Sequence, residues 1–153
     1  MQALLGALRA VQPRGETQLG PSLFALPRRI KRRGMVLLFS DCLGDWEATA
    51  KALKHARLRG HEVLVFQVMA PEELKFQFSR WSRFECLERN GLKLDLDPPT
   101  VREQYLNNVK RFLEQVERDC TDMGADHLFF ATDVDLGEAL NYYLNRRAAR
   151  IKR

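Results

Sequence analysis

Apolar residues fill three short runs of the chain, and longer segments with helical spacing separate these runs. The runs cover residues 35–39, 62–69 and 126–131. The first, with five consecutive apolar residues, is typical of a strand that is buried on both faces; the second is rich in β-branched residues, which favour strands, and the third is predicted as another core strand. Between them, apolar positions recur three and four residues apart, which predicts helices over 44–59 and from about Pro98 to Val116. Because strands and helices alternate, the pattern predicts an α/β fold with a three-layer parallel sheet.

The N-terminal part of the chain reads as two helices with no strand before them. Residues 2–11 and a segment from Leu19 to Gly34 carry apolar residues at helical spacing, and Pro27 is expected to kink the second helix. Only three core strands are predicted in the whole chain. We therefore expect a single partial domain over 1–153, N-terminally incomplete, which corresponds to the later half of a doubly wound fold.

A small β-hairpin excursion is predicted around residues 76–96. Asn90-Gly91 is a strong signal for a two-residue turn, since both residues tolerate positive φ. After it, Leu92, Leu94 and Leu96 alternate with charged residues, as on a half-buried strand.

The end of the first apolar run carries the strongest functional signal. Ser40 and Asp41 follow residues 35–39 directly, and ligands of open α/β sheets bind outside the carboxyl ends of the strands. Asp41 is thus a candidate for holding a cation or a proton. Ser40 is expected to serve the turn, Cys42 to be a small buried residue, and Asp45 to cap the next helix.

Composition places the chain among globular proteins with one domain. Its 153 residues are 45% hydrophobic and 29% charged, and no apolar run approaches the roughly 20 residues of a membrane span. No signal peptide is predicted at the N-terminus, and three widely spaced cysteines form no disulfide framework. The expected location is therefore the cytoplasm, with no membrane segment in this chain.

The net charge of +5 is concentrated in two arginine clusters. The first cluster lies within residues 28–33 and the second within 146–153; outside them, 15 basic residues face 20 acidic ones. Cations at helix ends offset the helix dipole without any ligand, so we expect no nucleic-acid partner. Nucleic-acid binding through the arginine clusters remains an alternative.

Ordered short motifs from about Val11 to Arg147 resemble the C-terminal portion of a von Willebrand factor A-type domain. The likeness is nearest to a bacterial family known as domain of unknown function fifty-eight. The motifs that carry it are residues 13–19, 32–41, 58–63, 71–74, 83–85, 96–98, Val101-Arg102, Tyr105 and Thr132-Asp133. The resemblance implies a Rossmann-like, von Willebrand A-like fold.

The wider fold carries a metal-ion-dependent adhesion site built from three segments. Thr17 matches the second segment and Asp41 the third, which implies that these two residues are metal ligands, with Mg²⁺ as the cofactor. The first segment, a D-x-S-x-S loop, is absent from this sequence. The resemblance therefore implies an incomplete site that holds Mg²⁺ weakly.

The resemblance also implies a non-enzymatic protein-interaction module. Relatives of this type act as adaptors of MoxR-type AAA+ ATPases, so such an ATPase, or the missing N-terminal half of the domain, is the expected partner. A metal-dependent phosphohydrolase using Asp41 is a second alternative. That chemistry requires another aspartate two residues further on, where this chain has Leu43.

Overall fold

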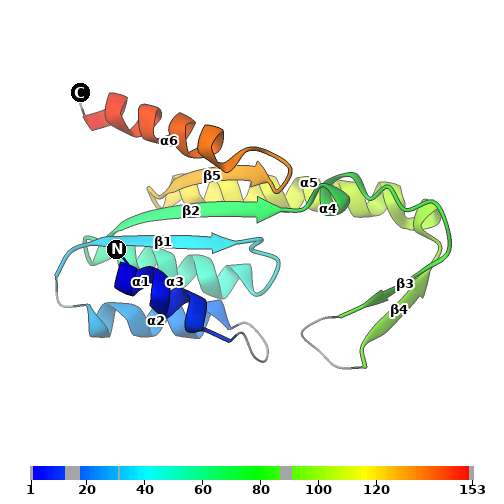
Figure 1. Cartoon of the computed structure of the whole chain (residues 1–153), viewed down its shortest axis with the longest axis horizontal. Helices are drawn as coiled ribbons and strands as arrows, with labels where there is room; N and C mark the ends of the chain where they lie inside the picture. The colour runs from blue at the N-terminus through cyan, green and yellow to red at the C-terminus, as the bar shows by residue number, and fades with distance from the viewer. Residues whose placement is uncertain (1, 13–17, 31, 87–90, 152–153) are drawn as a thin grey trace.

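The computed structural model of the chain describes residues 2–12, 18–30, 32–86 and 91–151. Helices and strands alternate along most of its length (Figure 1). In chain order the elements are α1 (Gln2–Ala10), α2 (Leu19–Arg29), β1 (Met35–Ser40), α3 (Trp46–Leu58), β2 (Glu62–Met69), α4 (Pro71–Lys75), β3 (Ser82–Glu85), β4 (Lys93–Leu96), α5 (Pro98–Asp122), β5 (Asp126–Ala131) and α6 (Leu136–Ile151).

The predicted parallel sheet is confirmed. Within the described residues, the strands from the three apolar runs pair in the order β1-β2-β5, and both pairings are parallel. Met35 lies opposite Glu62, and Leu64 lies opposite Asp126. All three strands consequently end at one edge of the sheet, as a parallel arrangement requires.

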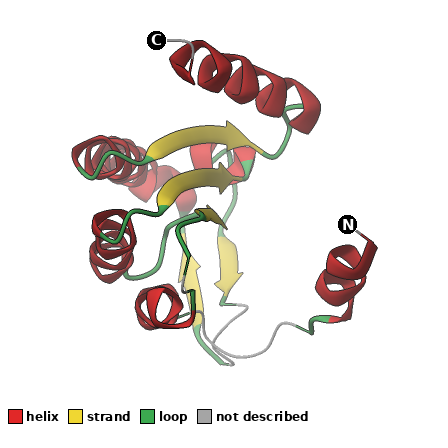
Figure 2. Ribbon diagram, turned by 90° about the vertical axis from the view of Figure 1, so that its left-hand side faces the viewer, coloured by secondary structure: helices red, strands yellow, loops and turns green. Residues whose placement is uncertain are grey.

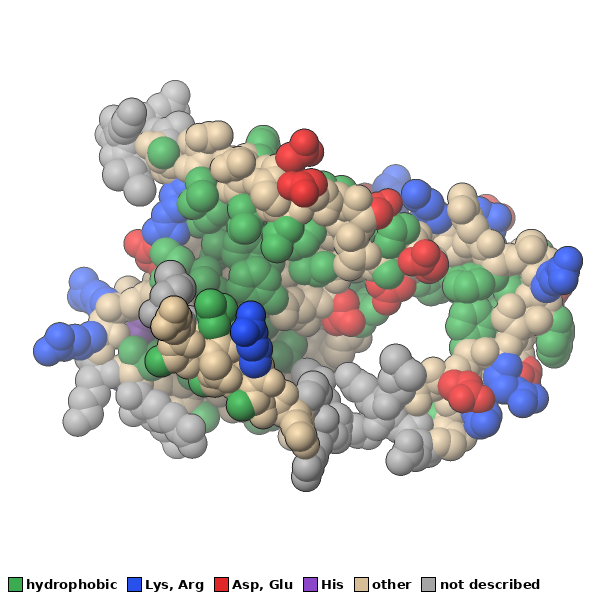
Figure 3. Space-filling model, in the orientation of Figure 1, with side chains coloured by type: hydrophobic (Ala, Val, Ile, Leu, Met, Phe, Trp, Pro, Cys, Tyr) green, Lys and Arg blue, Asp and Glu red, His purple; other side chains and the backbone are tan. Residues whose placement is uncertain are grey.

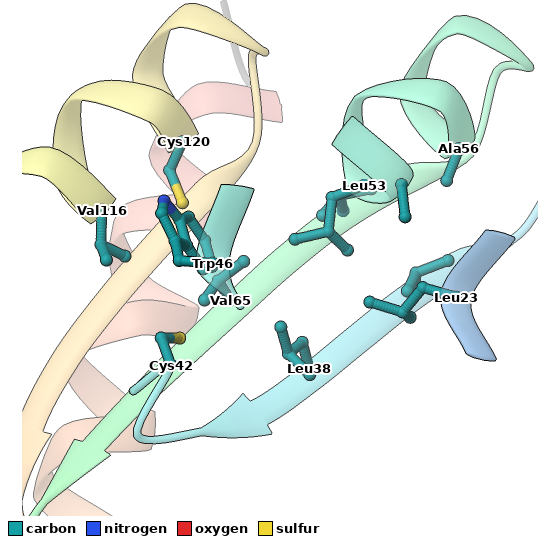
Figure 4. Close-up of a cluster of buried hydrophobic side chains, with 12 residues drawn as sticks. Leu23, Leu38, Cys42, Trp46, Leu53, Ala56, Val65, Val116 and Cys120 are labelled. Atoms are coloured by element: carbon teal, nitrogen blue, oxygen red, sulfur yellow. The ribbon is translucent and has the colours of Figure 1, made fainter. Parts of the chain in front are cut away.

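One face of the sheet packs against helices and forms the larger core. Val36 and Leu38 of β1 and Val63 and Val65 of β2 are buried there with residues of α2, α3 and α5 (Figure 4). Trp46 donates from Nε1 to the Asp119 carboxylate at 2.8 Å, which ties the start of α3 to α5. The alternate residues of each strand point to the opposite face.

On that opposite face, α6 covers only part of the sheet. Phe66 lies edge-on to Tyr143 of α6, and Leu64 and Leu128 are buried beside them. The β1 part of this face remains open, because Met35, Leu37 and Phe39 are 45%, 50% and 58% exposed. Viewed along the sheet, helices stand on both of its sides (Figure 2).

The β excursion is an antiparallel pair that projects from the body as an arm (Figure 1). Stacked and edge-on aromatic rings of Phe76, Phe78, Phe84 and Tyr105 form its base. The two-residue turn predicted at Asn90-Gly91 includes Asn90, which lies outside the described residues. The expectation of a half-buried strand is wrong for Leu92 and Leu94, which are both exposed.

The two N-terminal helices form as predicted, but α2 ends at Arg29 rather than at Gly34. Pro27 lies within α2. Helix α1 buries none of its described side chains, and Leu5 and Leu8 are both exposed. Its apolar stripe therefore predicted a helix without predicting a packing partner.

Local capping signals mark the starts of α3 and α6 and the end of α3. Asp45 and Asp135 accept backbone N–H bonds from Ala48 and Glu138 at the starts of α3 and α6. Gly60 ends the turn after α3 with φ +86°. Among the described residues, no helix is both long and apolar enough to cross a membrane.

Candidate functional site

Asp41 lies at the carboxyl end of β1, as the sequence predicted. Its side chain is exposed, and its Oδ1 accepts the N–H of Leu43 at 3.0 Å. This hydrogen bond holds the carboxylate against the loop that leads to α3. The position is the ligand edge of the parallel sheet, and it places a negative charge at the surface there.

The residues on either side of Asp41 shape the turn. Ser40 Oγ accepts the N–H of Cys42 at 3.0 Å, and Cys42 adopts a left-handed φ of 64° with its side chain buried. Burial and the neighbouring Asp41 charge raise the pKa of the Cys42 thiol to about 12, against a smaller lowering by Ser40. The thiol is thus protonated at neutral pH and acts as a packing group, which confirms both expectations.

Asp41 stands at the rim of a pocket of about 730 Å³. The start of α2 forms one wall, from Gln18 to Pro21, and the loop from Phe39 to Asp45 forms the other. Helix α2 reaches this place because Gly20 packs directly on Ala48 of α3, where an added Cβ would meet the Ala48 Cβ at 2.8 Å. The pocket therefore depends on a residue without a side chain at position 20.

Thr17, the second expected metal ligand, lies outside the described residues. Its chain neighbour Gln18 lines the same pocket as Asp41. Within the ranges that the structure describes, no group of three His, Cys, Asp or Glu side chains is arranged to hold a metal ion. The described donors by themselves therefore do not fit a tightly bound cation.

A buried amide supports the Asp41 loop from the neighbouring strand. Gln67 of β2 is fully buried and donates from Nε2 to the main-chain oxygen of Asp41 at 3.4 Å. Its Oε1 lies 3.1 Å from Nε2 of His127 on β5. A series of hydrogen bonds thus connects His127 on β5, Gln67 on β2 and the Asp41 loop that follows β1.

Sequence reasoning missed Gln67. The only available signal was a lone amide inside the apolar run of residues 62–69. A buried polar side chain needs hydrogen-bond partners, so an amide in such a run predicts a nearby polar group. Here the partners come from the two strands on either side.

Other residues singled out by the sequence have structural roles. His61 is buried and accepts the N–H of Gly34 on Nδ1 at 3.3 Å. Glu73 accepts the N–H of Ala70 at 2.7 Å and so caps the short helix α4. Neither group faces the Asp41 pocket.

Arg147, a member of the second arginine cluster, has a structural role. Its guanidinium donates to the Tyr143 hydroxyl at 2.9 Å and pairs with the Glu62 carboxylate. These hydrogen bonds raise the pKa of Arg147. The arginine thereby ties α6 to the start of β2.

Comparison with known protein families identifies the family to which the chain belongs. A family model described as protein of unknown function DUF58 matches residues 1–115, which is most of the sequence. Neither the curated proteins nor the solved structures contain a match. The chain belongs to the DUF58 family of proteins of unknown function.

Proposed function

We propose that the chain is a non-enzymatic protein-interaction module that engages its partner through the Asp41 edge of the sheet. One observation carries this proposal. The Asp41 carboxylate is exposed beside a pocket of about 730 Å³, and backbone and amide hydrogen bonds fix its loop from two sides. A fixed, exposed acid of this kind suits recognition of a positively charged group or a cation on a partner.

The proposal includes a cation shared with the partner. Carboxylate and hydroxyl oxygens are the ligands that Mg²⁺ prefers, and Asp41 with Thr17 resembles two segments of an adhesion-type site. Because these two residues supply few ligands, the ion is expected to bind weakly to the chain alone. A carboxylate from the partner would complete the shell, so that partner and ion bind together.

The expected partner is a MoxR-type AAA+ ATPase. This part of the proposal rests on the resemblance to von Willebrand A-type adaptors described above. Family membership in DUF58 is compatible with it and leaves the partner to be established.

Partner capture with and without a chelator tests the proposal. A MoxR-type ATPase is immobilised, and binding of the chain is measured in Mg²⁺ and in EDTA, for wild type and for Asp41→Ala. We expect Mg²⁺-dependent binding that Asp41→Ala abolishes. The matched control is Asp122→Ala, which removes an exposed acid at the far end of α5 and should bind like wild type.

Two outcomes would contradict the proposal. Equal capture of wild type and Asp41→Ala would exclude the Asp41 edge as the contact. Equal capture in Mg²⁺ and EDTA would exclude the shared cation.

A further inference from the structure

A cavity of about 530 Å³ lies between the sheet and α5. Gln67 of β2 and His127 and Phe129 of β5 line it on the sheet side, and residues of α5 line it on the other. Helix α5 lies behind the sheet in Figure 1, whereas Figure 3 shows the front face, where hydrophobic side chains gather between α6 and α1. The cavity shares no described lining residue with the Asp41 pocket and is therefore a separate site.

The wall of the cavity includes five apolar side chains that neither buried core uses. Within the described residues, none of the five packs against either core cluster, and none is fully buried. They are Leu74 of α4, Leu106, Val109 and Leu113 of α5, and Phe129 of β5. A concave, mostly apolar lining and a volume of roughly 300–1,000 Å³ are typical of pockets that bind small molecules.

The hydrogen bond between Gln67 and His127 fixes which nitrogen of the imidazole carries the proton. Gln67 donates from Nε2 to the Asp41 main-chain oxygen, so its Oε1 faces Nε2 of His127 and only accepts there. Nε2 therefore bears the hydrogen, and Nδ1 of the neutral ring carries a lone pair. Burial lowers the pKa of His127, and the charge of Glu117 raises it by less, so the ring is neutral at pH 7.

This Nδ1 atom is an accessible acceptor without a partner. In the described part of the chain, His127 makes one side-chain hydrogen bond, the one from Nε2. The buried side-chain nitrogen and oxygen atoms that lack a partner among those residues are His55 Nδ1 and Arg57 Nε, so Nδ1 of His127 is not buried. A ligand that donates a hydrogen bond can therefore reach it.

Glu117 adds a negative charge beside His127. Both residues line the cavity and also a neighbouring hollow of about 230 Å³. The Glu117 carboxylate forms no hydrogen bond or ion pair with any residue that the structure describes. Lys110, the one lysine or arginine among the described lining residues, lies two turns earlier on α5, about 10 Å along the helix axis. The end of the cavity at His127 thus offers acceptors and a negative charge, which suit a cation.

We propose that this cavity binds a small organic amine. The ammonium group donates to Nδ1 of His127 and pairs with the Glu117 carboxylate, while the hydrocarbon part lies against the apolar wall. An ammonium has three donors and no acceptor, which matches the two acceptors at this end. A carboxylate in the same place would be repelled by Glu117 and would meet an unprotonated Nδ1.

Ligand titrations of the whole chain, followed by two-dimensional NMR spectroscopy, test the proposal. The probe is 4-phenylbutylamine, compared with 4-phenylbutan-1-ol and 4-phenylbutyrate, which have the same number of carbons and a neutral or an anionic head. We expect saturable shifts of the amides of Val109, Glu117 and His127. The amine should bind roughly fivefold more tightly than the alcohol, the upper value for an ion pair at a protein surface. The acid should bind most weakly, and neither EDTA nor Asp41→Ala should change binding of the amine.

Two variants of cavity residues and one matched control complete the experiment. Glu117→Gln removes the charge at an exposed position and should weaken amine binding roughly fivefold while leaving alcohol binding unchanged. Val109→Phe adds a ring to the apolar wall and should weaken binding of all three compounds. Glu103→Gln removes an exposed acid of the same helix outside the cavity and should bind like wild type.

Four outcomes would overturn the proposal. Equal amine binding by wild type and Glu117→Gln would exclude the contact to the ammonium group, and tighter binding of the acid than of the amine would exclude the ligand class. Unweakened binding by Val109→Phe would place the ligand outside the cavity. Binding of a lysine-containing peptide without binding of the free amine would assign the cavity to a lysine side chain of a polypeptide.

Discussion

Gln67 holds the main-chain oxygen of Asp41 across 26 residues of sequence, through a 3.4 Å hydrogen bond from its Nε2. The amide is fully buried and reaches the Asp41 loop from β2, while His127 occupies its other end. The candidate site thus depends on a side chain that lies inside the sheet rather than at its surface.

Gln67→Leu should destabilise the fold by about 1–3 kcal/mol, because it leaves His127 without its partner inside the protein. Urea unfolding followed by circular dichroism measures the effect. Replacing both partners, as Gln67→Leu with His127→Phe, should cost less than the sum of the two single changes. Strictly additive losses would show that the pair is not coupled.

Stability should fall as the pH drops below the ordinary pKa of histidine, in part through His127. Burial lowers the pKa of His127 in the folded protein, so the unfolded state takes up its proton first. The unfolded chain then binds more protons, and stability rises with pH in the window below about 6.5. His127→Phe should flatten this part of a plot of unfolding free energy against pH. An unchanged slope would contradict the assignment.

Cys86 should be the cysteine that reacts with a thiol reagent in the native protein, since it is exposed while Cys42 and Cys120 are buried. Burial is also the main cause that raises the pKa of both buried thiols to about 12. At pH 8 both buried thiols are therefore protonated and react slowly. Absorbance after adding Ellman's reagent should show one fast thiol, lost in Cys86→Ser. Rapid labelling of that variant would contradict the buried placement.

The two tryptophans should contribute differently to the stability of the fold. Trp46→Phe removes the bond to Asp119 and should destabilise the fold by about 1–2 kcal/mol. Trp81 is 70% exposed on the arm, so Trp81→Phe should stay within about 0.5 kcal/mol of wild type. Thermal unfolding measures both variants. Equal losses would show that the arm is packed in solution.

Asp45→Ala should destabilise the protein by about 1 kcal/mol through loss of the α3 cap. Asp45→Ser retains an accepting oxygen and should recover most of this loss. Chemical unfolding distinguishes the two variants. If serine were as destabilising as alanine, the carboxylate would act through its charge rather than through the hydrogen bond to Ala48.

Patterns within one element were sufficient to predict much of the fold. Residues 35–39, 62–69 and 126–131 lie in strands, as their apolar runs predicted. The expected burial on both faces holds for β2 but not for β1, where Met35, Leu37 and Phe39 are exposed. Asp45 and Asp135 were readable as caps, since capping is set by residues a few positions away.

Relationships between distant elements could not be predicted in the same way. The apolar stripe of α1 gives no sign of whether anything covers it, and Leu5 and Leu8 are exposed. The alternation of Leu92 and Leu94 with charged residues likewise gives no sign of whether anything covers them, and both are exposed. Gln67 acquired its role only when folding placed β1 and β5 on its two sides.

The stacked aromatic rings at the base of the arm mark the boundary between the arm and the body of the protein. Phe76 and Tyr105 stack at 4.2 Å between ring centroids, just where the chain leaves the body after α4 and rejoins it along α5. Everything distal to that stack could be shortened, replaced by a flexible connector or extended with a reporter domain while β2 and β5 remain paired. The arm is therefore the natural insertion point for engineering this protein.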